Sequence, residues 1–224
     1  QEVLENAFSL ILRESVSLTG AGRTDAGVHA REMFAHFDSD LLFVGTELVH
    51  RLNAYLPEDI AIVSIFEVPA ESHARFDATE RTYEYWIVQN KNPFLVDRAY
   101  YVKYPLNIEQ MNKAAAILVV HKDFECFSKS NTDVKTYRCD VRKAQWIKDG
   151  EKLVFTISAD RFLRNMVRAI VGTLLDVGLG KSSPTDIKYI LASKDRAEAG
   201  VSVPAKGLYL TAIKYPKNSI DYNG

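Results

Sequence analysis

The chain of 224 residues lacks several features that would place it in a special class of proteins. Its two cysteines, Cys126 and Cys139, are too few for a disulfide framework and too isolated for a zinc site, so we expect reduced thiols and no bound metal. No apolar run is long enough to cross a bilayer, and no signal-peptide pattern opens the sequence. These absences favour a cytoplasmic protein without a membrane segment.

Glycine and proline are sparse, at 11 and 7 residues, which argues against disorder. With 47% hydrophobic residues, the chain can bury a core as one large domain or as two fused halves. An excess of basic charge is missing too, because the formal net charge is −1. A basic domain is the usual mark of an RNA-binding protein, but a near-neutral enzyme with a basic cleft can also bind RNA. The net charge therefore leaves RNA binding open.

Hydrophobic periodicity predicts helices and strands that alternate along the chain. Helical spacing is found at residues 2–14, 46–56, 107–120 and 162–177, and Ser183-Pro184 is expected to start a further helix. Strands are predicted at residues 31–38, 60–68, 78–90, 98–104, 136–148, 151–159 and 207–215. Asp149-Gly150 predicts a hairpin turn. Because no heptads or short repeats occur, we expect a mixed α/β or α+β sheet protein.

The most informative segment is the run from Gly20 to Ala30, which reads Gly-Ala-Gly-Arg-Thr-Asp-Ala-Gly-Val-His-Ala. Its glycines predict a shaped loop, and the loop presents one carboxylate, Asp25, two residues after Arg23. Such a carboxylate is suited to orient or attack a ligand. For an arbitrary glycine-rich loop, however, a tight turn whose aspartate caps a helix is the commoner explanation.

The complete string changes this balance. Residues 22–29 are an uninterrupted match to Gly-Arg-Thr-Asp-Ala-Gly-Val-His, and the loop thereby resembles the catalytic loop of the TruA family of tRNA pseudouridine synthases. Further segments resemble the other motifs of that family in the expected order: His73–Ala78 with Arg81–Tyr85, then Phe162–Gly172, then Ala205–Leu210.

The resemblance implies an α+β pseudouridine synthase fold, with a central mixed, mostly antiparallel sheet flanked by helices and a cleft between two related halves. We expect residues 1–105 to form the half with the aspartate loop and residues 106–224 to form the half with the third motif. The family carries an N-terminal strand ahead of the first helix. This sequence starts at Gln1, so we expect that strand to be missing.

The implied activity is the isomerisation of uridine to pseudouridine in the anticodon stem-loop of tRNA, at tRNA positions 38, 39 and 40, by a homodimer. The reaction exchanges one bond of the uracil ring to the ribose for another, so no cofactor or metal is implied. Asp25 would supply the carboxylate, which attacks C1′, adds to C6 or removes a ribose proton; the sequence leaves these three open. Arg168 is the candidate partner, because a neighbouring cation favours the ionised carboxylate.

Tyr83 is expected to stack on the displaced base and to help take the C5 proton, although strands are rich in ordinary tyrosines. Val167 is expected to wall the base pocket, and a plain core valine is equally consistent. Arg161, Arg164 and Arg168 fall at helical spacing and are expected to share one helix face. The complete set of RNA-binding candidates is Arg23, His29, Arg75, Arg81, Arg161, Arg164 and Val167.

Two rival functions compete with the isomerase. A non-catalytic module that binds structured RNA would require Asp25 to be only a loop cap. A glycoside hydrolase needs two carboxylates that flank the scissile bond, whereas this loop presents one. A Walker-type phosphate loop is excluded, because the run lacks the Gly-Lys-Ser/Thr ending. The isomerase explains the pattern best.

Overall fold

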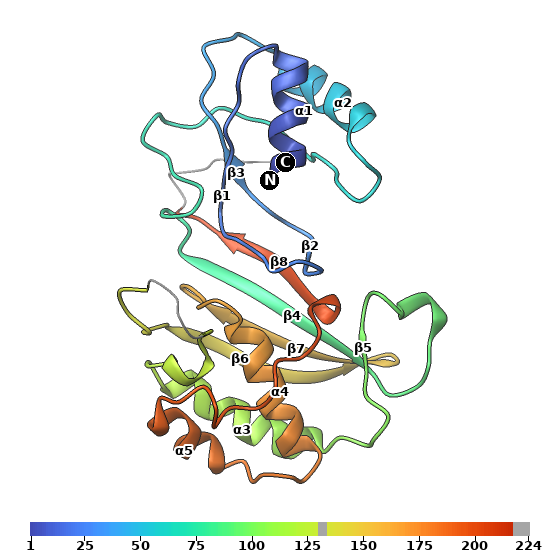
Figure 1. Cartoon of the computed structure of the whole chain (residues 1–224), viewed down its shortest axis with the longest axis vertical. Coiled ribbons are helices and arrows are strands. Elements are labelled where there is room, and N and C mark those ends of the chain that lie inside the picture. Colours follow the sequence, from blue (N-terminus) through green and yellow to red (C-terminus); the bar gives the residue numbers. More distant parts are fainter. Residues whose placement is uncertain (130–133, 217–224) are drawn as a thin grey trace. The chain divides into compact units, whose positions relative to one another are not determined.

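The computed structural model describes residues 1–129 and 134–216 (Figure 1). Contacts group these residues into two compact units, the first with residues 1–23, 33–78 and 215–216 and the second with residues 24–32 and 79–214. These units differ from a division at residue 105. Two related halves joined there stay a prediction, and residues 130–133 and 217–224 of the second half lie outside the described residues.

The first unit is built on two helices that share an apolar cluster. Helix α1 (Glu2–Leu12) buries Ala7 and Phe8, and α2 (Gly45–Tyr55) buries Leu48 and Leu52 in the same cluster. The short strands β1 (Thr19–Gly20) and β3 (Ala35–His36) pair antiparallel. Both helices confirm the periodicity of the sequence, whereas the strand expected at 31–38 is reduced to β3. Strand β2 (His29–Ala30), which precedes that range, belongs to the second unit.

The strand expected at residues 60–68 is wrong. Ile60, Ile62 and Ile65 do pack against the apolar cluster, which explains their spacing. Their backbone, however, joins no ladder. The Asn53 side chain on α2 donates from Nδ2 to the Ile62 carbonyl at 2.8 Å, and its Oδ1 accepts the Ile62 N–H at 2.7 Å. A side chain therefore takes the place that a neighbouring strand would have.

The second unit contains a mixed sheet in the order β2-β8-β4-β7-β6. Strand β4 (Glu80–Val88) pairs antiparallel with β7 (Lys152–Ala159) on one edge and with β8 (Leu208–Lys214) on the other. Strand β5 (Tyr100–Tyr101), shorter than the predicted 98–104, pairs parallel with the end of β4, beyond the reach of β8. β6 (Val141–Asp149) forms the predicted hairpin with β7, and β2 runs parallel to β8.

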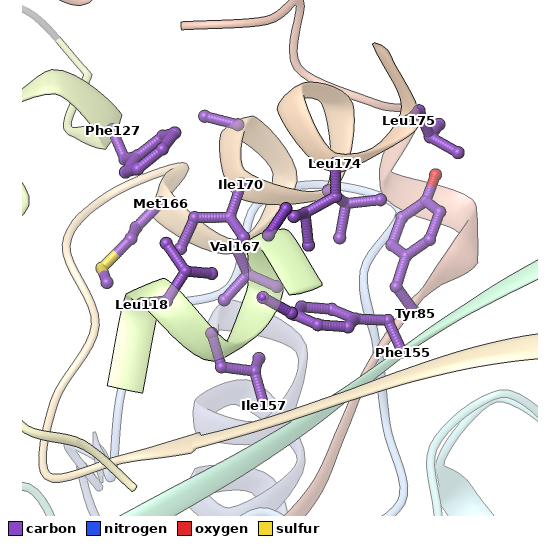
Figure 2. Packing of buried hydrophobic residues seen from close by; sticks show 14 of the residues in the cluster. Tyr85, Leu118, Phe127, Phe155, Ile157, Met166, Val167, Ile170, Leu174 and Leu175 are labelled. Carbon is purple, nitrogen blue, oxygen red and sulfur yellow. The ribbon is translucent and has the colours of Figure 1, made fainter. Parts of the chain in front are cut away.

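Helices α3 (Ile108–Val120), α4 (Met166–Gly178) and α5 (Asp186–Ser193) cover one face of this sheet (Figure 1). The main apolar cluster lies between these helices and the sheet. There Tyr85 and Phe155 of the sheet meet Val167, Ile170 and other residues of α4 (Figure 2). Short 3-10 helices lie at η1 (Pro93–Leu95), η2 (Glu125–Phe127) and η3 (Ala205–Gly207). A mixed sheet flanked by helices is the expected fold class.

Helix α4 begins later than predicted, which corrects one expectation about the site. Asn165 has a left-handed backbone with φ of 66°, so the helix starts at Met166. The Arg161 N–H is bound to Asp160 Oδ1 at 2.7 Å, outside any helix. Arg161, Arg164 and Arg168 therefore do not share a helix face, because the first two precede the helix. Helix α5 likewise starts after Ser183-Pro184, at Asp186.

Candidate active site

The Asp25 loop lies in the second unit, directly before β2. The Val28 N–H donates to the Asp25 carbonyl at 3.1 Å, which closes a tight turn. Within this turn Gly27 has φ of 80°, a left-handed conformation that favours glycine. The turn therefore fixes the direction in which the Asp25 side chain leaves the loop.

Asp25 forms an ion pair with Arg168, as the sequence predicted. Arg168 Nη1 donates to Asp25 Oδ2 at 2.8 Å, and the two side chains are 22% and 30% exposed. The carboxylate is thus partly screened from water but still reachable by a ligand. A charge-assisted hydrogen bond of this length is roughly twice as strong as a neutral one.

A second contact, with Val203, also holds the Arg168 side chain. Its Nε donates to the Val203 carbonyl at 2.8 Å, and the Val203 N–H donates to the Arg168 carbonyl at 3.2 Å. The guanidinium group is therefore fixed at two points, at Asp25 and at Val203. Two fixed points set the plane of the group, which a single point charge could not do.

The segment that carries Val203 is pressed against α4. A Cβ atom at Gly172 would lie 1.9 Å from the Val201 carbonyl oxygen, so only glycine allows this approach. The Gly200 N–H donates to Thr173 Oγ1 at 2.8 Å. Arg196 also fastens the segment, with bonds to the Ala199 and Gly200 carbonyls and to Ser202 Oγ. The backbone that orients Arg168 is thus held against α4 by several hydrogen bonds and a close approach.

Tyr83 lies on β4 with its ring edge-to-face against Phe162, at a centroid distance of 5.2 Å. Burial raises the pKa of Tyr83 to about 12; the nearby Arg81 charge lowers it, and the Asp25 charge raises it. The Asp25 charge therefore disfavours ionisation of the Tyr83 hydroxyl. Opposite Tyr83 the β4–β8 register shifts, so that Thr211 is an extra residue. Bulges of this kind often redirect a side chain next to a functional site.

Tyr85 belongs to this arrangement, although the sequence analysis did not single it out. Its ring is fully buried, and its hydroxyl donates to the Pro204 carbonyl at 2.8 Å, one residue beyond Val203. Tyr83 and Tyr85 are two residues apart on one strand, so alternation would place both on the same face. No sequence signal, however, points to Pro204 as the acceptor.

The other candidates have separate environments. His29 stacks on Tyr209 at 4.6 Å and its Nε2 lies 3.2 Å from the Asp97 carbonyl oxygen, which is a structural arrangement. Arg81 Nη1 donates to the Asp160 carbonyl at 3.0 Å. Val167 is 5% exposed within the main cluster, which favours the core role over the pocket wall.

Four arginines complete the candidate set. Arg161 is partly exposed, whereas Arg23, Arg75 and Arg164 have exposed side chains. Arg23 and Arg75 belong to the first unit. Because Asp25 belongs to the second unit, the boundary between the units falls within the motif at residues 22–29. Arg161 and Arg164 belong to the second unit, in the segment that leads into α4. Exposed basic side chains thus occur in both units.

The described residues contain no group of three or more histidine, cysteine, aspartate or glutamate side chains that could hold a metal ion. In the same part of the chain, no helix is long and apolar enough to cross a membrane.

Comparison with known proteins identifies the family. The family model for tRNA pseudouridine synthase matches residues 114–216. The chain is 48% identical to tRNA pseudouridine synthase A of Parabacteroides distasonis, over 97% of this chain and 86% of that protein. It is 49% identical to the Porphyromonas gingivalis protein of the same name, over 97% and 88% of the two chains. A Clostridium tetani relative, tRNA pseudouridine synthase A 2, is 41% identical over 96% and 88%. The chain therefore belongs to the tRNA pseudouridine synthase family.

Proposed function

We propose that this chain isomerises uridine to pseudouridine in the anticodon stem-loop of tRNA, with Asp25 as the catalytic carboxylate. The observation that carries the proposal is the Asp25–Arg168 ion pair, formed by the two motif residues that the sequence singled out. The relatives named tRNA pseudouridine synthase A support the reaction and the class of substrate.

The proposed reaction breaks the bond between ribose C1′ and uracil N1 and forms a bond between C1′ and C5. The C5 hydrogen leaves as a proton and N1 gains one, so no oxidant or reductant is needed. Asp25 acts at C1′, at C6 or on a ribose proton, and a carboxylate can serve in each role only while it is ionised and oriented. Arg168 supplies the positive charge and, through Val203, the orientation.

Tyr83 is proposed as the ring that contacts the displaced base. With a pKa of about 12, its phenol stays neutral at neutral pH and is a poor acceptor for the C5 proton. The exposed arginines Arg23, Arg75 and Arg164 are proposed to bind RNA phosphates. Flipping a base from its stack costs a few kcal/mol, which such contacts would offset. We also propose a cytoplasmic homodimer, as the resemblance implies; native mass measurement tests the dimer.

The test is release of tritium from C5-labelled uridine in unmodified tRNA, with tRNA affinity measured in parallel. The parent chain is expected to release tritium, and Asp25→Asn is expected to bind tRNA without release. Asp59→Asn, which removes the same charge from an exposed residue of the first unit, is the matched control and should stay active. Turnover by Asp25→Asn would contradict the role of Asp25. Binding without turnover by the parent would favour the alternative, a non-catalytic RNA-binding module.

A further inference from the structure

Residues 73–77 of the first unit form a turn in which every backbone N–H group has an acceptor. The ring of one histidine, His73, accepts two backbone N–H groups at its Nδ1 atom. All five backbone N–H groups of the turn have acceptors: His73 to Asp77 Oδ2 at 2.6 Å, Ala74 to His36 Nδ1 at 3.1 Å, Arg75 and Phe76 to His73 Nδ1 at 3.1 and 3.2 Å, and Asp77 to the His73 carbonyl at 3.0 Å. With every donor paired, the turn has one defined shape.

The turn is also fastened to its surroundings. The Tyr215 hydroxyl donates to the Ala74 carbonyl at 2.5 Å, and the Tyr215 ring packs edge-to-face on Phe34 at 5.2 Å. The rings of His36 and His73 meet edge-to-face at 4.7 Å. The first two residues of the turn, His73 and Ala74, are thus tied to segments that are distant in the sequence.

This rigid turn holds a large apolar ring in water. Phe76 is 75% exposed. Its ring meets the His73 ring at a centroid distance of 4.2 Å, and the Arg75 guanidinium lies 5.8 Å from its centroid. The ring is therefore in contact with an imidazole and near a cation while much of its surface stays open. An aromatic group held in this way loses little freedom when a flat ligand binds it.

Phe94 provides a contrast. Its side chain is 88% exposed on η1, and in the described part of the chain its ring meets no other ring or cation. Exposed apolar side chains that occur singly need no special explanation, and Phe94 is of this kind. Phe76 differs because the turn and its two neighbours fix its orientation.

We propose that the Phe76 ring, with Arg75 beside it, is a stacking site for an unpaired nucleobase of the bound tRNA. The proposal rests on the proposed function, because it takes tRNA as the ligand. Proteins read unpaired RNA by stacking its bases on aromatic rings and by placing cations at its backbone. The polar residues that flank Phe76 in the turn, His73 and Asp77, suit a single base better than an apolar protein surface.

The test measures the tRNA dissociation constant of the full chain by fluorescence anisotropy of labelled, unmodified tRNA. Phe76→Ala is expected to weaken binding by about 5- to 100-fold, the range that loss of one stacked base produces. Phe76→Trp is expected to restore parental affinity, because its ring can stack in the same place. Phe94→Ala, which removes an equally large exposed ring, is the matched control and should bind like the parent.

Phe76→Trp gives a second readout. The two natural tryptophans, Trp86 and Trp146, are buried at 8% and 2% exposure, so the introduced indole would be the exposed one. Stacking on a base is expected to quench its fluorescence when tRNA is added, whereas parental fluorescence should change little. This signal separates direct stacking from a merely structural role of the ring.

The outcomes distinguish this proposal from the proposed function. A parent that binds tRNA together with a folded Phe76→Ala variant of equal affinity would overturn the stacking site alone. Weaker binding by Phe76→Ala without quenching in Phe76→Trp would also overturn it. If the parent itself does not bind tRNA, the proposed function and the stacking site both fail.

Discussion

The Tyr85 hydroxyl donates a 2.8 Å hydrogen bond to the carbonyl of Pro204, the residue that follows the Val203 carbonyl bound to Arg168 Nε. A buried residue of the sheet is thus connected to the proposed catalytic pair through two adjacent carbonyl groups. Removing one hydroxyl oxygen would leave the Pro204 carbonyl without this donor and loosen the backbone that orients Arg168.

The variant Tyr85→Phe is therefore expected to lower kcat by about tenfold, since a lost buried hydrogen bond costs about 1–3 kcal/mol. Its tRNA affinity should change little. Single-turnover kinetics with saturating enzyme measure this change. The control is Asn112→Ala, which removes two hydrogen bonds to the Trp146 backbone, far along the chain from Arg168. It should reduce stability without reducing kcat. A folded Tyr85→Phe variant with parental kcat would contradict the link between Tyr85 and Arg168.

Arg168→Lys keeps the positive charge but replaces a planar group that binds at two points. One ammonium group cannot reproduce the geometry that joins Asp25 Oδ2 and the Val203 carbonyl. Loss of a hydrogen bond to a charged group costs about 1.5–3 kcal/mol, so turnover is expected to fall by about 10- to 100-fold. Tritium release measures the effect, and Arg51→Lys, at an exposed position of α2, should leave turnover unchanged. Full activity of Arg168→Lys would show that charge alone suffices.

Gly172→Ala is expected to have two opposing effects on the free energy of unfolding, and they differ in size. Alanine favours a helix interior over glycine by about 1 kcal/mol. The added Cβ atom, however, would lie 1.9 Å from the Val201 carbonyl oxygen, a backbone atom that cannot rotate away. Overpacking costs about 1–3 kcal/mol or more, so the variant is expected to be less stable. Urea unfolding checks this, with Gly22→Ala as control because its Cβ would meet nothing within 4 Å. A more stable Gly172→Ala variant would contradict the close approach.

The two buried thiols lead to a prediction about the free energy of unfolding at alkaline pH. Burial raises the pKa of Cys126 and of Cys139 to about 12, above the ordinary thiol value of 9.0. The unfolded chain therefore releases these protons at lower pH than the folded chain, and the free energy of unfolding falls as pH rises from about 9 towards 12. Tyr83, also raised to about 12 by burial, acts in the same direction above pH 10. Urea unfolding at pH 8 and pH 10.5 measures the change, and greater stability at pH 10.5 would contradict it.

At pH 8 the same shift keeps both thiols protonated and unreactive. Iodoacetamide is expected to leave the native chain unmodified and to alkylate both cysteines in urea. Mass spectrometry of the two samples distinguishes them. Rapid alkylation of the native chain would show that the thiols are not buried.

Long periodic segments of this chain could be predicted from the sequence, because their pattern and their hydrogen bonds are both local. Helix α3 occupies nearly its predicted range and is capped by Asn107, whose side chain accepts the Gln110 N–H. The hairpin at Asp149-Gly150 forms as expected, with Gly150 at φ of 60°. Residues 60–68 could not be assigned correctly, because their backbone bonds to the side chain of Asn53, which periodicity does not reveal.

The candidate site divides in the same way. Asp25, Tyr83 and Arg168 were found because each lies in a motif that can be recognised in the sequence. Arg196, Val203 and Pro204 were not found, because two of them act through carbonyl groups and the third through bonds to backbone and a serine. Backbone acceptors carry no mark in the identity of their residue.

The shortness of strand β2 has a consequence for the local opening of the loop that precedes it. It pairs with β8 at two residues only, His29 with Tyr209 and Ala30 with Leu210. The loop before it is thus held by a short ladder that ends with the Arg31 N–H bond to the Leu210 carbonyl, by the contacts of His29 and by the Asp25–Arg168 bond. Local opening of residues 24–30 should require much less free energy than global unfolding, and these amides should exchange hydrogen sooner than those of β4 and β7. The loop proposed to carry the catalytic carboxylate can thus open locally while the sheet beneath it stays intact.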